Sequence, residues 1–165
     1  MKRSIVLLFA LSFIIGLGLA RAQNKIMVEN VTGNPDTNAT VAITVTSDKD
    51  LAGICFTIKF DPTKLQISAT AIGAAAAKMD TVGVNVDSAN SDGLLEVCLL
   101  DFTVVEAGYF TNPIVAGENQ EIFMVTFTVN AEEEIPIELI DVSLSDSEAQ
   151  DIWVTIINGT INKGF

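Results

Sequence analysis

The sequence contains no histidine and only two cysteines, and these shortages exclude several kinds of site. Histidine is the commonest general base in enzymes and a common zinc ligand. Two cysteines, Cys55 and Cys98, are too few for a structural zinc site and too far apart for a C-x-x-C redox pair. The chain also lacks a glycine-rich phosphate loop and a G-x-S-x-G nucleophile motif. We therefore expect no catalytic residues.

Arginine is absent after residue 21, and lysine is scarce throughout. The first 22 residues combine a basic start (Lys2 and Arg3), an apolar run over 5–19 and a final A-R-A sequence of the small-x-small type. This pattern predicts a secretory signal peptide over 1–22, so that residues 23–165 form a secreted or cell-surface protein with no membrane insertion after cleavage. A retained membrane anchor is the alternative, although the apolar run is short for a span.

Acidic residues dominate the chain that remains after cleavage. Six lysines stand against 21 acidic residues in 23–165, which gives a formal net charge of −15. Phosphate-binding surfaces need clustered lysine and arginine, so we expect no nucleic-acid partner. The acidity suits either a cationic partner or simple solubility. Paired carboxylates remain the one catalytic option, but nearly all of the acids fall in turns or at outward strand positions, where contact with water explains them.

Short strands with alternating apolar residues fill the rest of the chain. Valine, isoleucine, threonine and phenylalanine recur within them, and clusters of Gly, Asn, Asp, Ser and Pro separate the runs. Nine strands are predicted, over residues 26–31, 39–45, 51–60, 65–72, 82–87, 94–100, 121–129, 135–144 and 152–161. This spacing is typical of an all-β protein and predicts an antiparallel β-sandwich in a single domain.

Two segments depart from the strand pattern. Residues 73–79 contain four alanines and predict one or two helical turns. Residues 102–119 carry Tyr109, Phe110 and Pro113 without a clear period, and they predict a long loop packed by its own side chains.

The stretch LAGICFTIKFDPTKL, residues 51–65, resembles the A-G-x-x-F-x-x-x-[YF]-D-P-x-x-L signature of cohesin domains, which are β-sandwich modules that bind dockerin modules in cellulosome-type assemblies. Residues 90–101 (NSDGLLEVCLLD) resemble the D-G-x-L-x-V strand of the family. Residues 122–129 resemble its F-x-x-T-F-x-V strand, and residues 139–161 its closing pair of strands. The resemblance covers nearly all of 23–165 and implies a nine-stranded, jelly-roll sandwich.

Membership of that family would imply a non-catalytic, extracellular protein–protein interaction module that binds a dockerin-containing protein. It would place the partner on the sheet formed by the predicted strands at 51–60, 82–87, 94–100 and 135–144. Calcium in such a complex is expected on the dockerin, and no cofactor is expected on this chain. Isolated cohesins of this kind would also suit assemblies other than those that degrade cellulose.

Side-chain alternation then gives the residues that this sheet would present to a partner. They are Gly53, Cys55, Thr57, Lys59, Asn85, Asp87, Glu96, Cys98, Leu100, Glu138 and Ile140. Val82, Val84 and Val86 are expected to point inward. A bulge is expected near Asp141, because the alternation changes phase there.

The two cysteines fall on the same outward side, and their strands are neighbours in the cohesin order. Residues opposite each other across an antiparallel pair lie within bridging distance, and export favours oxidation. We therefore expect a disulfide between Cys55 and Cys98, with two unpaired thiols as the alternative. Leu100 and Ile140 would form an apolar centre beside the bridge, which suits a binding surface. The alternative for Leu100 is that the loop at 102–119 folds over it.

A carbohydrate-binding or adhesive sandwich is the alternative function, with polysaccharide as the partner, because similar folds carry both functions. Sugar-binding faces need exposed flat aromatics, and this chain offers one tryptophan, Trp153, and one tyrosine. A structural calcium ion is a further candidate, although no EF-hand loop is present. Its acidic loop ligands would come from Asp48, Asp50, Asp92, Asp146 and Asp151.

Overall fold

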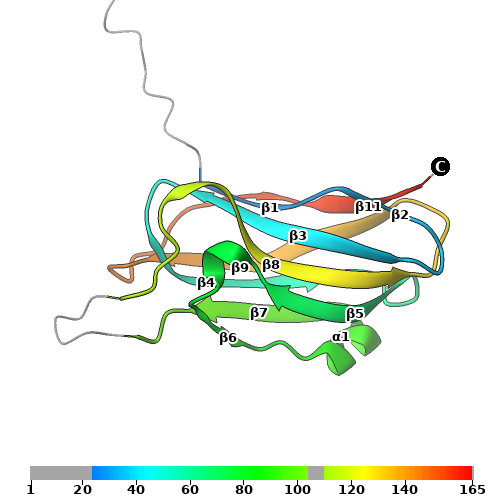
Figure 1. Cartoon of the computed structure of the whole chain (residues 1–165), viewed down its shortest axis with the longest axis horizontal. Coiled ribbons are helices and arrows are strands. Elements are labelled where there is room, and N and C mark those ends of the chain that lie inside the picture. Colours follow the sequence, from blue (N-terminus) through cyan, green and yellow to red (C-terminus); the bar gives the residue numbers. More distant parts are fainter. Residues whose placement is uncertain (1–23, 104–109, 165) are drawn as a thin grey trace, which may run out of the picture.

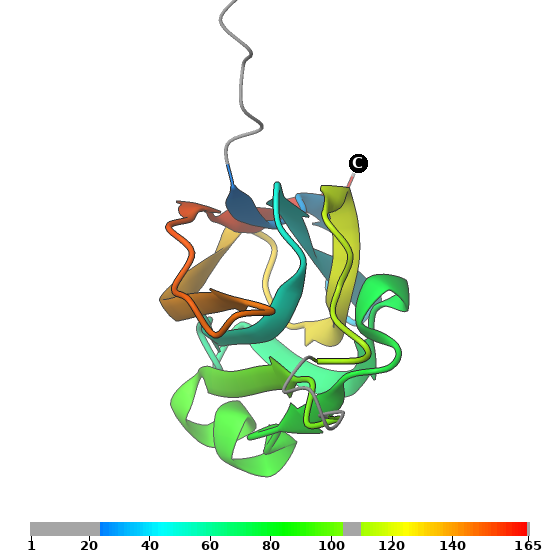
Figure 2. The same ribbon diagram turned by 90° about the vertical axis from the view of Figure 1, so that its left-hand side faces the viewer.

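The computed structural model describes residues 24–103 and 110–164, which form two β-sheets packed face to face (Figures 1 and 2). One sheet has five strands in the order β10-β1-β3-β8-β5, and the other has six in the order β2-β11-β9-β4-β7-β6. The bounds are β1 Lys25–Val28, β2 Val31–Gly33, β3 Asn38–Ser47, β4 Leu51–Lys59, β5 Leu65–Ile72, β6 Asp80–Val82, β7 Leu94–Leu100, β8 Gly117–Val129, β9 Ile135–Asp146, β10 Thr155–Ile157 and β11 Gly159–Lys163. The predicted all-β sandwich is confirmed.

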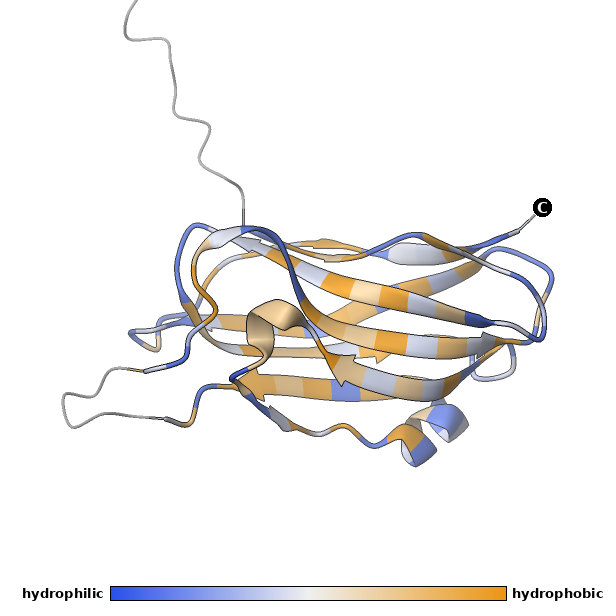
Figure 3. Cartoon of the chain, in the orientation of Figure 1, coloured by the Kyte–Doolittle hydropathy of each residue, from blue (hydrophilic) through white to orange (hydrophobic). Residues whose placement is uncertain are grey.

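Period-two alternation builds the core between the sheets. Figure 3 shows the alternation as hydrophobic bands separated by paler ones along β3 and β8. Two edge-to-face aromatic pairs join the layers at the centre: Phe56 with Phe123 at a centroid distance of 6.1 Å, and Phe60 with Phe127 at 5.1 Å. All four rings are buried, so these pairs add a specific geometry to the burial of apolar area.

The terminal strands differ from the prediction in a systematic way. The strand predicted over 26–31 is split into β1 and β2, and the strand predicted over 152–161 is split into β10 and β11. Each split places one half in each sheet. The described chain therefore has eleven strands rather than nine, and the pairs β1/β10 and β2/β11 run parallel rather than antiparallel.

A close crossing explains why the last strand breaks where it does. Gly159 follows the break, and a Cβ at this position would lie 2.7 Å from the Val28 carbonyl oxygen. The Asn158 side chain accepts a hydrogen bond from the Leu139 backbone N–H at 2.9 Å. At Asn158–Gly159 the chain thus passes from one sheet to the other.

The strand predicted over 82–87 is wrong. Its residues after Val82 lead into a short helix, α1 (Val86–Asp92), which begins at the N-cap Asn85 and ends at Gly93 with φ of 76°. The Asn85 side chain accepts from the Ser88 backbone N–H at 3.1 Å, and Gly93 supplies the left-handed C-terminal residue. These two end signals outweigh the alternating valines that suggested a strand.

Helix α1 closes the gap between the free edge of β5 and strand β7. Ala89 of the helix is fully buried in the core. The Asn90 side chain accepts from the Ile67 backbone N–H at 2.6 Å and donates to its carbonyl oxygen at 3.0 Å. This pairing continues the hydrogen bonding of the β5 edge, which would otherwise be open to another strand.

The two segments predicted to be non-strand, 73–79 and 102–119, agree only in part with their predicted structures. The alanine-rich segment forms a single 3-10 turn, η1, at Ala74–Ala76. The described part of the predicted loop at 102–119 pairs Ile114 with Leu51, and the following strand β8 already begins at Gly117. Residues 1–22 of the predicted signal peptide, and Tyr109 in the loop, lie outside the described residues. Within the described part of the chain, no helix has the length and apolar character needed to cross a membrane.

Candidate partner-binding surface

Four strands, β9, β4, β7 and β6, expose one continuous side of the six-stranded sheet. Their registers place side chains in rows across the strands, for example Ile140, Thr57 and Glu96 in one row. We call this side the outer face. It comprises Gly53, Cys55, Thr57, Lys59, Asp80, Val82, Leu94, Glu96, Cys98, Leu100, Glu138, Ile140, Ser143 and Ser145.

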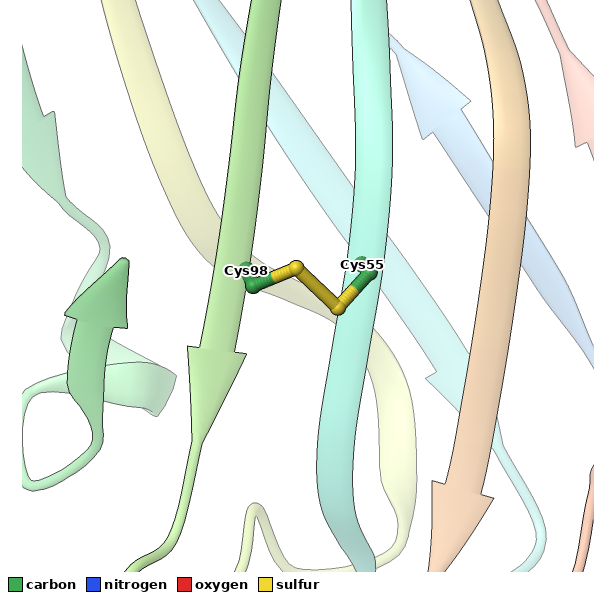
Figure 4. Close-up of a disulfide and its surroundings, with 2 residues drawn as sticks. All are labelled: Cys55 and Cys98. Atoms are coloured by element: carbon green, nitrogen blue, oxygen red, sulfur yellow. A yellow bond between two sulfur atoms is a disulfide. The ribbon is translucent and has the colours of Figure 1, made fainter. Parts of the chain in front are cut away.

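A disulfide bridge occupies the centre of the outer face. Cys55 of β4 and Cys98 of β7 are direct cross-strand partners with a Cα–Cα distance of 4.1 Å, and they are bonded. Figure 4 shows the bridge spanning the gap between the two strands. Both residues are half-buried rather than interior, so the predicted bridge and its outward position are confirmed.

Near the bridge, Gly53 of β4 has no side chain, so side chains of the neighbouring strands β7 and β9 can lie over β4 at this position. Gly53 lies opposite Leu100 on one side and Ser145 on the other. A Cβ at Gly53 would lie 2.7 Å from Ser145 Oγ and 3.3 Å from Leu100 Cδ2. Leu100 itself stays partly exposed. The missing side chain therefore flattens this end of the outer face.

Two exposed apolar residues of the outer face were missed from the sequence. Val82 is 48% exposed and pairs with Cys98, whereas alternation had predicted it inward. Leu94 is 41% exposed at the far end of β7, opposite Lys59. The alternation in the sequence could have indicated the exposure of Leu94, because Leu94 has the same parity as the outward residues Glu96 and Cys98. For Val82, the misassigned strand reversed the face.

Charge on the outer face is mostly negative and only partly compensated. Lys59 and Glu138 are cross-strand partners, and Lys59 Nζ lies 2.9 Å from Glu138 Oε2. Both side chains are well exposed, so this ion pair adds little stability. The uncharged Thr57, between Ile140 and Glu96 in its row, is largely buried, with 8% of its surface exposed. Glu96 is exposed, and no cation of the described residues pairs with it.

Two predicted site residues lie beside the outer face rather than on a strand of it. Asn85 caps α1, and Asp87 lies in the first turn of that helix. Both are exposed. They were assigned to a strand, which is wrong because the capping residues of α1 place this segment in a helix. That these two residues bind a partner stays a prediction.

The predicted bulge in β9 is confirmed. Cys55 of β4 pairs with Ser143 of β9, and Thr57 of β4 pairs with Ile140 of β9. Two residues along β4 thus correspond to three residues along β9. The extra residue is accommodated near Asp141, which has a φ of 52°. The bulge returns Leu144 to the core and keeps Ile140 on the outer face.

A model of the cohesin domain family matches residues 25–162, which is most of the chain. The chain belongs to the cohesin family. Cohesin domains are non-catalytic interaction modules. A comparison with curated protein sequences finds no match.

Solved cohesin structures share the fold of this cohesin at low sequence identity. The sixth cohesin of scaffoldin B from Acetivibrio cellulolyticus, in complex with a Cel5 dockerin, is 18% identical, with a TM-score of 0.70 over 86% of this chain and 99% of its own. The cohesin of a Coh-OlpA-Doc918 complex from Clostridium thermocellum is 16% identical, with the same TM-score over 86% and 99%. A non-cellulosomal cohesin from the archaeon Archaeoglobus fulgidus is 15% identical, with a TM-score of 0.68 over 87% and 93%.

Two of the candidate calcium ligands, Asp146 and Asp50, accept hydrogen bonds from donors of the protein itself. The Asp146 carboxylate accepts from Lys49 Nζ at 2.6 Å and from the backbone N–H groups of Glu148 and Gln150 at 3.0 and 2.9 Å. The Lys49 hydrogen bond, followed by that of the Gln150 backbone, holds the pKa of Asp146 below its ordinary value of 3.8. Asp50 accepts from the Ala116 backbone N–H at 2.7 Å. No group of three or more acidic or cysteine side chains placed to hold a metal ion occurs in 24–103 or 110–164.

The single tryptophan lies in the connection between β9 and β10. Trp153 is 95% exposed, between buried Ile152 and strand β10 at the edge of the five-stranded sheet. Ile156 and Ile157 of β10 are also partly exposed, at 42% and 39%. This edge is therefore a second apolar area on a different sheet.

Proposed function

We propose that this cohesin binds a dockerin-bearing protein through the outer face, without a reaction of its own. The observation that carries the proposal is a sheet face whose apolar centre, formed by the disulfide, Val82, Leu100 and Ile140, is partly exposed among the described residues, in a chain of the cohesin family. An apolar centre with a polar rim is the usual composition of a protein–protein interface. Two of the three solved structures named above are cohesins in complex with dockerins.

The proposal includes an extracellular location. Residues 1–22 have the pattern of a secretory signal, and the disulfide fits an oxidising compartment. It does not require a cellulose-degrading assembly, because the archaeal structure of the same fold is described as non-cellulosomal. Calcium in the complex would belong to the dockerin. A chelator should therefore abolish capture of the partner and leave the melting temperature of this cohesin unchanged.

Capture of dockerin modules by immobilised residues 23–165 tests the proposal. The double variant Leu100→Asp, Glu96→Lys should abolish capture with little change in melting temperature, because Glu96 is exposed and Leu100 is partly so. The matched control is Ile156→Asp, Glu118→Lys, which likewise replaces an aliphatic residue and a glutamate, but on the five-stranded sheet, and it should bind normally. Unaltered capture by the outer-face variant would refute the assignment of the face.

Polysaccharide binding is a second candidate, favoured by the 95% exposure of Trp153. An exposed indole ring offers a flat apolar surface of the kind that stacks on a sugar ring. Trp153→Ala should then abolish retardation of the protein in gels that contain polysaccharide, and dockerin capture should stay intact. Equal mobility of wild type and variant in every such gel would exclude the second candidate.

A further inference from the structure

Glu96 is the one charged residue of β7, whose sequence is LLEVCLL. In Figure 3 the corresponding strand is mostly hydrophobic in colour and contains a hydrophilic band. β7 lies between β4 and β6 in the sheet, but β6 ends at Val82, opposite Cys98. At Glu96 the neighbours across the sheet are therefore Thr57 of β4 and the backbone of Gly83. An isolated carboxylate in this position has no role in the packing of the fold.

The surroundings of Glu96 leave it accessible and without a compensating charge. Thr57 lies directly opposite it, and Leu94 and Cys98 precede and follow it on the same side of β7. On the other side the backbone of Gly83 passes alongside, so that a Cβ on Gly83 would lie 3.8 Å from Glu96 Cβ. Lys59, one row away, is already paired with Glu138 at 2.9 Å.

A partner that covers β4 and β7 would remove water from Glu96. Burying a carboxylate without an opposite charge is strongly unfavourable, whereas a charge-assisted hydrogen bond to Lys or Arg offsets that cost. We propose that the docking surface of the partner carries a Lys or Arg opposite Glu96, and that this contact selects among dockerins. The inference rests on the proposed function and names the chemistry of its partner.

The same geometry assigns the small residues around Glu96 a part in this selection. Thr57 presents a short side chain, and Gly83 presents none. Neither of them places a long side chain beside the carboxylate, so a long cationic side chain from the partner can reach it. A partner with Asp or Glu at that position is rejected, because two like charges would be buried together.

The test is selection from a library of dockerin modules displayed on yeast in the presence of calcium, with the surface positions of the docking helices randomised. The baits are residues 23–165 as wild type, Glu96→Gln, Glu96→Lys and the control Glu118→Lys, each first shown to be folded by its melting curve. Wild type and Glu118→Lys should enrich Lys or Arg at one helix position. Glu96→Gln should lose this preference, and Glu96→Lys should enrich Asp or Glu at the same position.

The individual modules then give the size of the effect. A module selected on the wild type should bind Glu96→Lys at least about 30-fold more weakly, and exchange of its cation for Glu should restore most of the affinity. Enrichment of the same modules by wild type and Glu96→Lys would overturn this inference and leave dockerin binding intact. If no bait enriches any module, the proposed function fails and this inference fails with it.

Discussion

At the scale of single residues, Asp146 holds the turn that leads from β9 toward β10. Its side chain is 5% exposed, and it is satisfied by Lys49 and by two backbone N–H groups of the turn. Ile152 then pairs back onto Leu144 through a backbone hydrogen bond of 2.9 Å. One carboxylate therefore determines the path of the chain from one sheet to the other.

Asp146→Asn is expected to lower the free energy of unfolding at pH 7 and to lose this effect in acid. The folded pKa of Asp146 is depressed, mainly by Lys49, so the carboxylate stabilises the fold fully above the unfolded value near 3.8. That contribution disappears as the pH falls through the lower folded pKa. Urea unfolding of wild type and variant between pH 7 and about pH 2 measures it. A stability difference that stays constant over this range would contradict the assignment.

Residue-level prediction from the sequence succeeded where strand assignment was right. Cys55, Cys98 and Glu96 were placed outward because alternation within β4 and β7 is unbroken. Val82 was placed inward because Val84 and Val86 share its parity, and that parity has no meaning across the start of a helix. The error came from one wrong element and not from the rule of alternation.

At the scale of elements, the strand pair β4–β7 supports the outer face. Seven consecutive residue pairs join these strands without a bulge, and the disulfide crosses near the middle of this ladder. Strand β9 on the other side of β4 contains the bulge near Asp141. The bridge therefore fixes the regular half of the surface to which a partner would bind.

Replacement of both Cys55 and Cys98 by alanine should lower the free energy of unfolding by roughly 4 kcal/mol, because the bridge closes a separation of 43 residues in the unfolded chain. Chemical denaturation of wild type and variant gives the difference. A dithiol reductant should bring the wild type to about the stability of the variant and have no effect on the variant. Equal stability of the oxidised wild type and the variant would show that the bridge does not stabilise the fold.

Helix α1 and the splits in the two terminal strands are the elements that could not be predicted from local sequence patterns. The segment VDSANSD has weak helix formers, and its helix depends on the caps Asn85 and Gly93 and on burial of Ala89. The transfer at Asn158–Gly159 depends on the close approach of Val28, a residue 131 positions earlier than Gly159. Contacts of this range leave no local pattern in the sequence.

At the scale of the whole molecule, two sources of information were needed. Composition and alternation indicated a sandwich, and the order of the strands and the expectation of a dockerin partner came from the resemblance to cohesins. The family match over residues 25–162 and the observed order β9-β4-β7-β6 agree with that resemblance. The outer face belongs to the six-stranded sheet, and the exposed Ile156 and Ile157 of β10 belong to the five-stranded sheet, so the roles of these two apolar areas are separable by experiment.

The most direct measurement is a methyl NMR titration of residues 23–165 with a calcium-loaded dockerin that the protein captures. If the outer face is the docking surface, the methyl signals of Val82, Leu94, Leu100 and Ile140 should shift or broaden at equimolar dockerin. Those of Ile156 and Ile157 at the opposite sheet should stay in place. Shifts confined to Ile156 and Ile157, with the four outer-face residues unchanged, would place the partner on the other sheet and contradict the proposed function of the outer face.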